Sequence, residues 1–368
     1  MNPILTYLKN VFASKRIVGG ELHLNGHTKA DALLQNLFLQ NRIPGLAITV
    51  LKEGETIFQK GYGFADVREN IPINPQQTIF RIASVSKPIA ATALAYMVKE
   101  GILDLDVSFY TYVPDYPKKR WDFTIRQLAG HTAGVRAYKG KEYGLNEPYT
   151  IRDSLRIFKE DPLLFEPGKG YLYTSFGWVL ISLAMEEASG IPFEEYVQEK
   201  VLNPLGLTNT FIPKYHPERS RSKGGKDVNE ISTFHEQANL ATFYTKVAAG
   251  FRKAILVNNF YKLAAGGYLS TSEDVAKLGQ AYLDKKVIAE DVLKQFITSQ
   301  ELKGKPTYYG LGWQVSKDAH GRKFHGHVGN GVGGYSNFFV YTDEQLVVSI
   351  LINCTDPKIQ HELDEVVV

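Results

Sequence analysis

Residues 80–87 read Phe80-Arg81-Ile82-Ala83-Ser84-Val85-Ser86-Lys87 and join a short β-rich segment to a helix. Beyond this run, apolar residues recur at helical spacing, at Ile89, Ala90, Ala93, Leu94 and Met97. Gly101 then stops the pattern. The sequence therefore predicts a strand over 79–83 and a helix over 84–100, with Ser84 at the junction between them.

A Ser-x-x-Lys spacing begins at this junction. A helix places Ser84 and Lys87 on one face, so that the lysine reaches the serine hydroxyl. The positive end of the helix dipole and partial burial disfavour an ammonium, which lowers the pKa of Lys87 toward that of a usable base. The pair is a candidate nucleophile and base; the alternative is a helix-capping serine beside a solvated lysine. The same spacing at Ser220 to Lys223 lies in a polar stretch where no helix is predicted, so we dismiss it.

The rest of the chain places β-rich runs at both ends and helices in the middle. Strands are predicted at 46–52, 56–63, 309–315, 323–328, 336–341 and 346–354, and helices at 28–42, 124–129, 150–159, 175–189, 193–201, 272–283 and 289–299. We expect an α/β (α+β) fold in which an antiparallel sheet, built from both chain ends, is flanked by helices. The expected sheet domain comprises residues 1–100 and 262–368, and residues 101–261 form an inserted, mostly helical lobe.

Composition excludes several classes of function. The 368 residues include 42 basic and 39 acidic side chains, and this balance provides no basic stripe for nucleic acid. The longest apolar stretch, 176–185, is shorter than the roughly 18 residues of a membrane span. Residues 1–12 show no export signal, so the chain as written is expected in the cytoplasm, whereas removal of a leader would make it periplasmic or secreted. Cys354, the single cysteine, is expected to be a buried structural thiol.

Several further blocks occur in the order typical of one family. They are Ile43-Pro44-Gly45-Leu46-Ala47, Gly61-Tyr62-Gly63-Phe64-Ala65-Asp66, Leu128-Ala129-Gly130-His131-Thr132-Ala133-Gly134, Phe165-Glu166-Pro167-Gly168, Asn203-Pro204-Leu205-Gly206-Leu207 and Ala265-Gly266-Gly267-Tyr268-Leu269-Ser270. Together with residues 80–87, they resemble the serine β-lactamase and penicillin-binding-protein superfamily, in particular its class C-like esterase and D,D-peptidase branch. The resemblance implies a β-lactamase/transpeptidase-like fold and acyl transfer through Ser84 and Lys87, without a cofactor.

The family's second motif, Tyr-x-Asn, corresponds to Tyr173-Thr174-Ser175. The resemblance gives Tyr173 the role of general base or proton relay beside Lys87, and a phenol can act as the base only if an adjacent ammonium lowers its pKa. Ser175 is shorter than asparagine and lacks the amide that would contact a substrate carbonyl. This departure weakens the analogy to members that cleave amides. The alternative for Tyr173 is a half-buried aromatic with a satisfied hydroxyl.

The third motif, Lys-Thr-Gly, corresponds to His327-Val328-Gly329. A neutral histidine is a poorer partner than lysine for a substrate carboxylate. Gly329 is expected to let the backbone approach the substrate. The backbone N–H of Ser84, at the start of the predicted helix, is the first expected donor of an oxyanion hole, and that of Asn330 is the second. His325 and His327 alternate on a strand with no third ligand in view, so no metal site is expected.

The sequence therefore predicts a serine hydrolase that forms an acyl-enzyme on small esters or D-amino-acid amides. The alternatives are a class C-like β-lactamase or D,D-carboxypeptidase, and a non-catalytic binding or self-assembling scaffold of the same fold. The expected partner is a small ester, peptide or lactam. The natural substrate and the oligomeric state stay open at this point.

Overall fold

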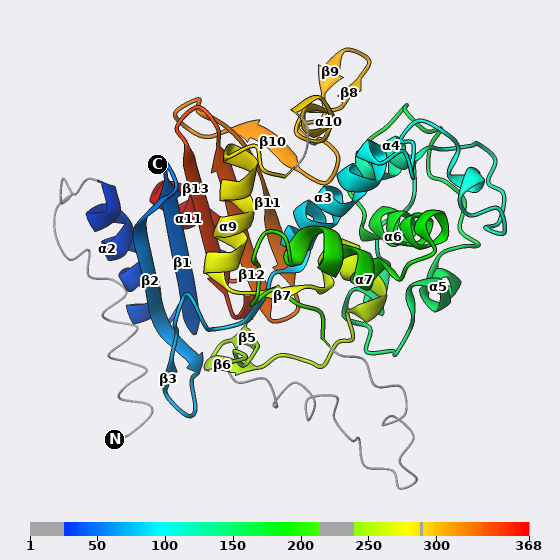
Figure 1. Ribbon diagram of the computed structural model, residues 1–368. Coiled ribbons are helices and arrows are strands. Elements are labelled where there is room, and N and C mark those ends of the chain that lie inside the picture. The colour runs from blue at the N-terminus through cyan, green and yellow to red at the C-terminus, as the bar shows by residue number, and fades with distance from the viewer. Residues whose placement is uncertain (1–25, 214–238, 288–289, 368) are drawn as a thin grey trace, which may run out of the picture.

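A computed structural model describes residues 26–213, 239–287 and 290–367 (Figure 1). The helices discussed below are α2 (Gly26–Leu39), α3 (Ser86–Lys99), α4 (Ile125–Ala129), α5 (Ile151–Ser154), α6 (Ser175–Ser189), α7 (Phe193–Val197), α9 (Ser272–Leu283), α10 (Glu290–Phe296) and α11 (Gln360–Val367). The strands are β1 (Gly45–Lys52), β2 (Glu55–Asp66), β3 (Ile71–Pro72), β4 (Phe80–Arg81), β5 (Tyr244–Val247), β6 (Gly250–Lys253), β7 (Leu269–Ser270), β8 (Glu301–Leu302), β9 (Lys305–Pro306), β10 (Gln314–Lys317), β11 (Lys323–Gly331), β12 (Gly334–Tyr341), β13 (Leu346–Ile352) and β14 (Cys354–Thr355).

The main sheet has seven strands in the order β10-β11-β12-β13-β1-β2-β3. Its centre joins the two ends of the chain, because β1 pairs antiparallel with β13 and Leu46 lies opposite Ile352. The prediction of one antiparallel sheet built from both ends is therefore confirmed. The domain boundaries stay a prediction.

Helices cover both faces of this sheet (Figure 1). Helices α2 and α11 pack on one face, over the apolar cluster that includes Leu34, Ile48 and Ile350. Helix α9 packs on the other face, against β1, β12 and β13, beside the helical part of the molecule. All eight residues of β12 are buried, because neither face of a covered strand contacts water.

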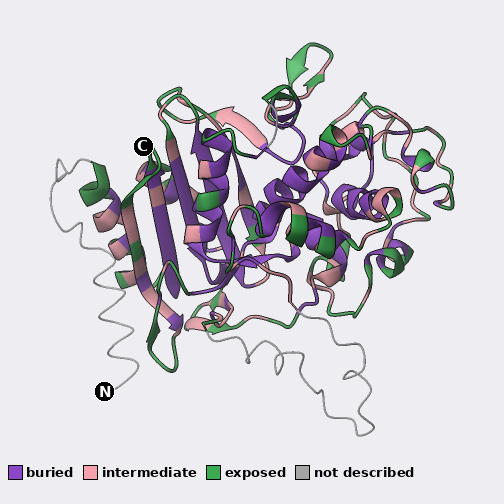
Figure 2. Cartoon of the chain, in the orientation of Figure 1, coloured by how far each residue is buried: buried purple, intermediate pink, exposed green. Residues whose placement is uncertain are grey.

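Two central helices, α3 and α6, are buried on nearly all sides (Figure 2). A helix that is apolar all round is typical of a core element. The structure begins α3 at Ser86, two residues later than predicted, and places Ser84 in a 3-10 turn over Ala83–Val85. An α-helix that included Ser84 would need an N–H at position 88 to donate to the Ser84 carbonyl, and Pro88 has none. The proline therefore keeps Ser84 in the preceding turn.

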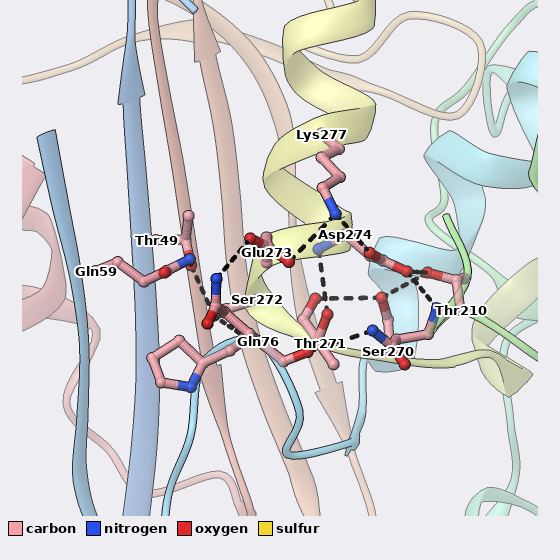
Figure 3. A network of polar contacts seen from close by, with 12 residues as sticks. Thr49, Gln59, Gln76, Thr210, Ser270, Thr271, Ser272, Glu273, Asp274 and Lys277 are labelled. Atoms are coloured by element: carbon pink, nitrogen blue, oxygen red, sulfur yellow. Dashed lines mark hydrogen bonds and ion pairs between the residues drawn. The ribbon is translucent and has the colours of Figure 1, made fainter. Parts of the chain in front are cut away.

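A polar network fixes the start of α9 beside the sheet (Figure 3). The Thr271 side chain caps the helix by accepting from the N–H of Asp274 at 3.2 Å. The buried Asp274 carboxylate accepts from the Asn209 N–H at 2.7 Å and from the Thr210 hydroxyl at 3.1 Å. Burial raises the pKa of Asp274. The network thereby ties the segment after β7 to a distant part of the chain, and β7 itself pairs with β4, the strand that leads to Ser84.

One predicted strand is wrong, and the prediction for Cys354 is confirmed. The predicted strand at 309–315 is wrong for most of its length, because β10 begins at Gln314. Gly312 has φ of 84°, and a Cβ there would lie 2.7 Å from the Trp178 ring, so this segment is irregular and tightly packed. Cys354 is buried, as predicted. Ser220 to Lys223 lie outside the described residues. Among those that are described, no helix has the length and apolar character needed to cross a membrane.

Candidate active site

Ser84 lies in a turn that is held from several sides. The residue before it, Ala83, has φ of 46°, a left-handed conformation that costs a residue with a Cβ of order 1 kcal/mol. The Ser336 hydroxyl donates to the carbonyl of Ile82 at 2.7 Å and so ties β12 to this turn. The surrounding fold therefore holds the Ser84 backbone in a conformation that the local sequence alone disfavours.

Two side chains converge on the Ser84 hydroxyl. Lys87 Nζ lies 3.2 Å from Ser84 Oγ, and the Tyr173 hydroxyl donates to the same oxygen at 2.9 Å. Lys87 Nζ also donates to the carbonyl of Ala265 at 2.7 Å. One N–H of a neutral amine can make this last contact while its lone pair faces the serine proton. The structure thus brings together the three residues for which the sequence analysis predicted catalytic roles.

The electrostatics favour a neutral Lys87. Its side chain is fully buried, and burial together with the nearby Lys262 lowers its pKa well below the ordinary value. A buried amine with a lowered pKa is suited to accept a proton near neutral pH.

The pKa of Tyr173 is shifted in the opposite direction from that of Lys87. The sequence analysis made a Tyr173 base conditional on an ammonium that lowers the pKa of the phenol, but burial raises this pKa. The phenol therefore keeps its proton, and its geometry is that of a donor to Ser84 Oγ. Of the two roles considered, the structure favours the proton relay over the general base.

The start of α6 positions Tyr173. Thr174 caps this helix, since its hydroxyl accepts from the N–H of Phe176 at 3.1 Å and donates to the carbonyl of Arg136 at 2.6 Å. The N–H of Thr174 donates to His131 Nδ1 at 3.3 Å, and the centre of the His131 ring lies 4.5 Å from the centre of the Tyr173 ring. A helix cap and a buried imidazole therefore fix the direction of the phenol.

Strand β11 passes directly beside the nucleophile. A Cβ at Gly329 would lie 2.5 Å from the Ile82 carbonyl oxygen and 3.1 Å from the Ser84 nitrogen. The glycine is thus required for contact between the strand and the Ser84 turn. The sequence analysis expected it instead to allow the backbone to approach a substrate. Asn330 follows it, is exposed, and lines the cleft that contains Ser84.

His327 does not line that cleft. It is 1% exposed, its Nδ1 lies 2.7 Å from the Val328 carbonyl, and its Nε2 lies 2.9 Å from the Tyr309 hydroxyl. These contacts match a neutral ring that donates from Nδ1 and accepts at Nε2. Burial and the nearby Lys87 lower the pKa of His327 to about 3. The ring therefore supports the tyrosines behind Ser84, and its location does not suit the predicted contact with substrate.

The cleft beside Ser84 is small and open to solvent, with a volume of about 40 Å³. Ser175 lies in it and forms a hydrogen bond with Tyr138. Its lining consists of Ala83, Ser84, Tyr138, Tyr143, Ser175, Asn259, Lys262, Ala265, Gly266, Asn330, Gly331 and Val332. None of these residues is acidic.

Three residues of the site were missed by the sequence analysis. Lys262 lines the cleft, and His131 and Tyr309 pack around Tyr173. His131 falls within a block quoted for the family resemblance, so a signal was present, and its φ of 60° marks an unusual turn. Nothing in the local pattern around Lys262 or Tyr309 distinguishes them from surface residues. Within the described part of the chain, no three His, Cys, Asp or Glu side chains converge as metal ligands.

An antiparallel sheet with an adjoining helical region and a Ser–Lys–Tyr cluster beside β11 defines a serine hydrolase fold of the β-lactamase type. The family model described as Beta-lactamase matches residues 29–367, and the chain belongs to this family.

The chain is similar to proteins that carry different names. The human mitochondrial serine beta-lactamase-like protein LACTB is 29% identical over 315 residues, which cover 65% of this chain and 53% of the human protein. The chain thus spans about half the length of that relative. Esterase EstB of Burkholderia gladioli is 30% identical over 52% of this chain and 53% of the esterase. The D-amino acid amidase of Ochrobactrum anthropi SV3 superposes with a TM-score of 0.76 at 19% identity, over 93% of this chain and 97% of the amidase, which shows a shared fold.

Proposed function

We propose that this protein is a serine hydrolase that forms an acyl-enzyme on Ser84 and acts on small esters or D-amino-acid amides. The observation that carries the proposal is the convergence of Lys87 Nζ and the Tyr173 hydroxyl on Ser84 Oγ, at 3.2 and 2.9 Å. A capping serine and a solvated lysine, the alternative reading, would not leave the lysine fully buried.

The geometry supports the following acylation. Ser84 Oγ attacks the substrate carbonyl while its proton passes to the neutral amine of Lys87. The backbone N–H groups of Ser84 and Asn330 hold the oxyanion. When the tetrahedral intermediate collapses, the leaving group takes a proton from the Tyr173 phenol, which regains one from the Lys87 ammonium. Deacylation then uses water, which gives a proton back through Lys87 and releases the acid and free Ser84.

The site favours small esters as the first substrate class. Ser175 provides a hydroxyl where the resembled motif has an amide, and His327 is buried away from the cleft. Both differences weaken the contacts that a β-lactam or D-alanyl substrate would need. We therefore rank esters first, D-amino-acid amides second and β-lactams third. One relative of this chain, Esterase EstB, is named for ester hydrolysis, which supports the first rank.

Mass spectrometry of the protein after exposure to a fluorophosphonate probe tests the proposal. We expect one label, on Ser84, and no label on Ser84→Ala. Ser220→Ala is the matched control, because it removes the serine of the second Ser-x-x-Lys spacing and should leave labelling unchanged. A label on Ser220, or none in a folded sample, would refute the assignment and favour the scaffold alternative.

A further inference from the structure

Lys262 is a second buried lysine in the cleft beside Ser84. The residue is 7% exposed, and its Nζ donates to the carbonyl of Tyr143 at 3.2 Å. No salt bridge within residues 26–213, 239–287 and 290–367 involves it. A buried cation without a paired carboxylate is costly to the fold, so its presence needs an explanation.

Aromatic rings surround this ammonium. Nζ lies 5.3 Å from the centre of the Tyr138 ring, 5.9 Å from that of Tyr143 and 5.5 Å from that of Tyr261. Ring faces attract a cation but do not neutralise it. Burial and the charge of Arg81 lower the pKa of Lys262 to about 7. An anion beside Nζ would supply the missing counter-charge and restore the ammonium.

The other residues of the cleft also favour an anionic ligand. Among the described residues, none that lines the cleft is acidic, and Lys262 is near enough to Lys87 to lower the pKa of that residue. An anion that enters this cleft meets the attractive potential of Lys262 and no carboxylate among the described lining residues. Glu142 acts on Tyr138 and Tyr261 from nearby, but it is paired with Arg136. His327, at the position where the resembled motif has its lysine, is buried and neutral. Lys262 comes from a different element, the turn Phe260–Lys262, and it is the lysine that shares the cleft with Ser84.

We propose that Lys262 binds a carboxylate of the substrate, so that within the ester class ranked first the preferred substrates are those whose carboxylate lies close to the scissile carbonyl. This inference rests on the proposed function. The carboxylate belongs either to the acyl part or to the leaving group, and the same contact with Nζ serves both.

Paired substrates distinguish the two sources. For the acyl part, the mono-p-nitrophenyl ester of glutarate is compared with p-nitrophenyl butyrate. For the leaving group, the acetyl ester of meta-hydroxybenzoate is compared with phenyl acetate. The ratio of kcat/KM for the anionic ester to that for the neutral ester is measured at about pH 6. Lys262 also influences the pKa of Lys87, and a change there would alter the reactivity of Ser84 toward both esters of a pair alike. The ratio of the two kcat/KM values therefore reports only the contact with the carboxylate.

In Lys262→Met, we expect this ratio to fall roughly tenfold to a hundredfold in one of the two pairs, as for loss of a charge-assisted hydrogen bond. Lys262→Arg should keep most of the preference for the anionic ester, because it retains the positive charge. Lys99→Met is the matched control, because Lys99 is exposed at the end of α3, and its ratio should not change. Unchanged ratios in both pairs for Lys262→Met would overturn the proposal.

A measurement on the unaltered protein covers the case in which Lys262→Met does not fold. Glutarate should protect Ser84 from the fluorophosphonate at lower concentration than glutaramide does, and equal protection would overturn the carboxylate site. Failure of the proposed function has a different result: no ester is hydrolysed and Ser84 is not labelled even without a competitor.

Discussion

Replacement of Lys262 with methionine should make the protein more stable, and the gain should depend on pH. A pKa lowered from 10.5 to about 7 in the folded state corresponds to on the order of 5 kcal/mol, at roughly 1.4 kcal/mol for each tenfold change. The substitution also removes the hydrogen bond to Tyr143, worth about 1 kcal/mol, and the contacts with the aromatic rings, worth about 1 kcal/mol together. We therefore expect Lys262→Met to raise the free energy of unfolding by about 3 kcal/mol at pH 7 or below.

The sign of the pH dependence follows from proton binding. Between pH 7 and 10.5 the unfolded chain keeps a proton on Lys262 that the folded protein has released, so the stability of the unaltered protein rises with pH across this window. The advantage of Lys262→Met is therefore largest below pH 7 and shrinks as the pH approaches 10.5.

Urea unfolding at about pH 6.5 and 9.5, followed by tryptophan fluorescence, measures this difference. Lys99→Met, on an exposed part of α3, is the control for loss of one positive charge and should change stability by less than about 0.5 kcal/mol. A Lys262→Met protein that is less stable than the unaltered one at both pH values would refute the reasoning. An equal gain in the free energy of unfolding at both pH values would also refute it.

Four further outcomes are expected at the site. Tyr173→Phe should lower kcat by roughly a hundredfold on an alkyl ester, whose leaving group needs a proton, while labelling of Ser84 is retained, and full turnover would make the phenol structural. His327→Lys should lower stability by several kcal/mol in thermal unfolding, since it buries a charge beside Tyr309, and it should not improve cephalosporin hydrolysis. Gly329→Ala should cost more than tenfold in kcat/KM, because the added Cβ displaces the Ser84 turn; unchanged kinetics would contradict the close approach. For a neutral ester, kcat/KM should rise with pH and level off below the ordinary lysine pKa, as Lys87 loses its proton, and a rise that continues past pH 10 would assign the base elsewhere.

The elements that depend on local pattern were predictable. The alternation and turn signals at 46–63 and 323–354 identified strands of the sheet, and the helical spacing after Ser84 identified α3 to within two residues. The error at the start of α3 has a local cause as well, because Pro88 removes the N–H that would have extended the helix. The strand predicted at 309–315 failed because packing against Trp178 requires a positive φ at Gly312, and periodicity does not report that contact.

The sequence by itself determined the order of the motifs, the Ser84–Lys87 spacing and the presence of strands at both ends, since these follow from residue type and local periodicity. The tertiary structure decided which side chains share a site. Tyr173 is 89 residues from Ser84 and Lys262 is 178 residues away. That Tyr173 contacts the Ser84 hydroxyl and Lys262 lines the cleft beside Ser84 depends on how α3, α6 and the 260–267 segment pack. It also decided the protonation states, because burial lowers the pKa of Lys87 and raises that of Tyr173, and burial is a property of the folded surroundings rather than of the residue. For the same reason His327, expected to face the substrate, became a buried support for the tyrosines behind it.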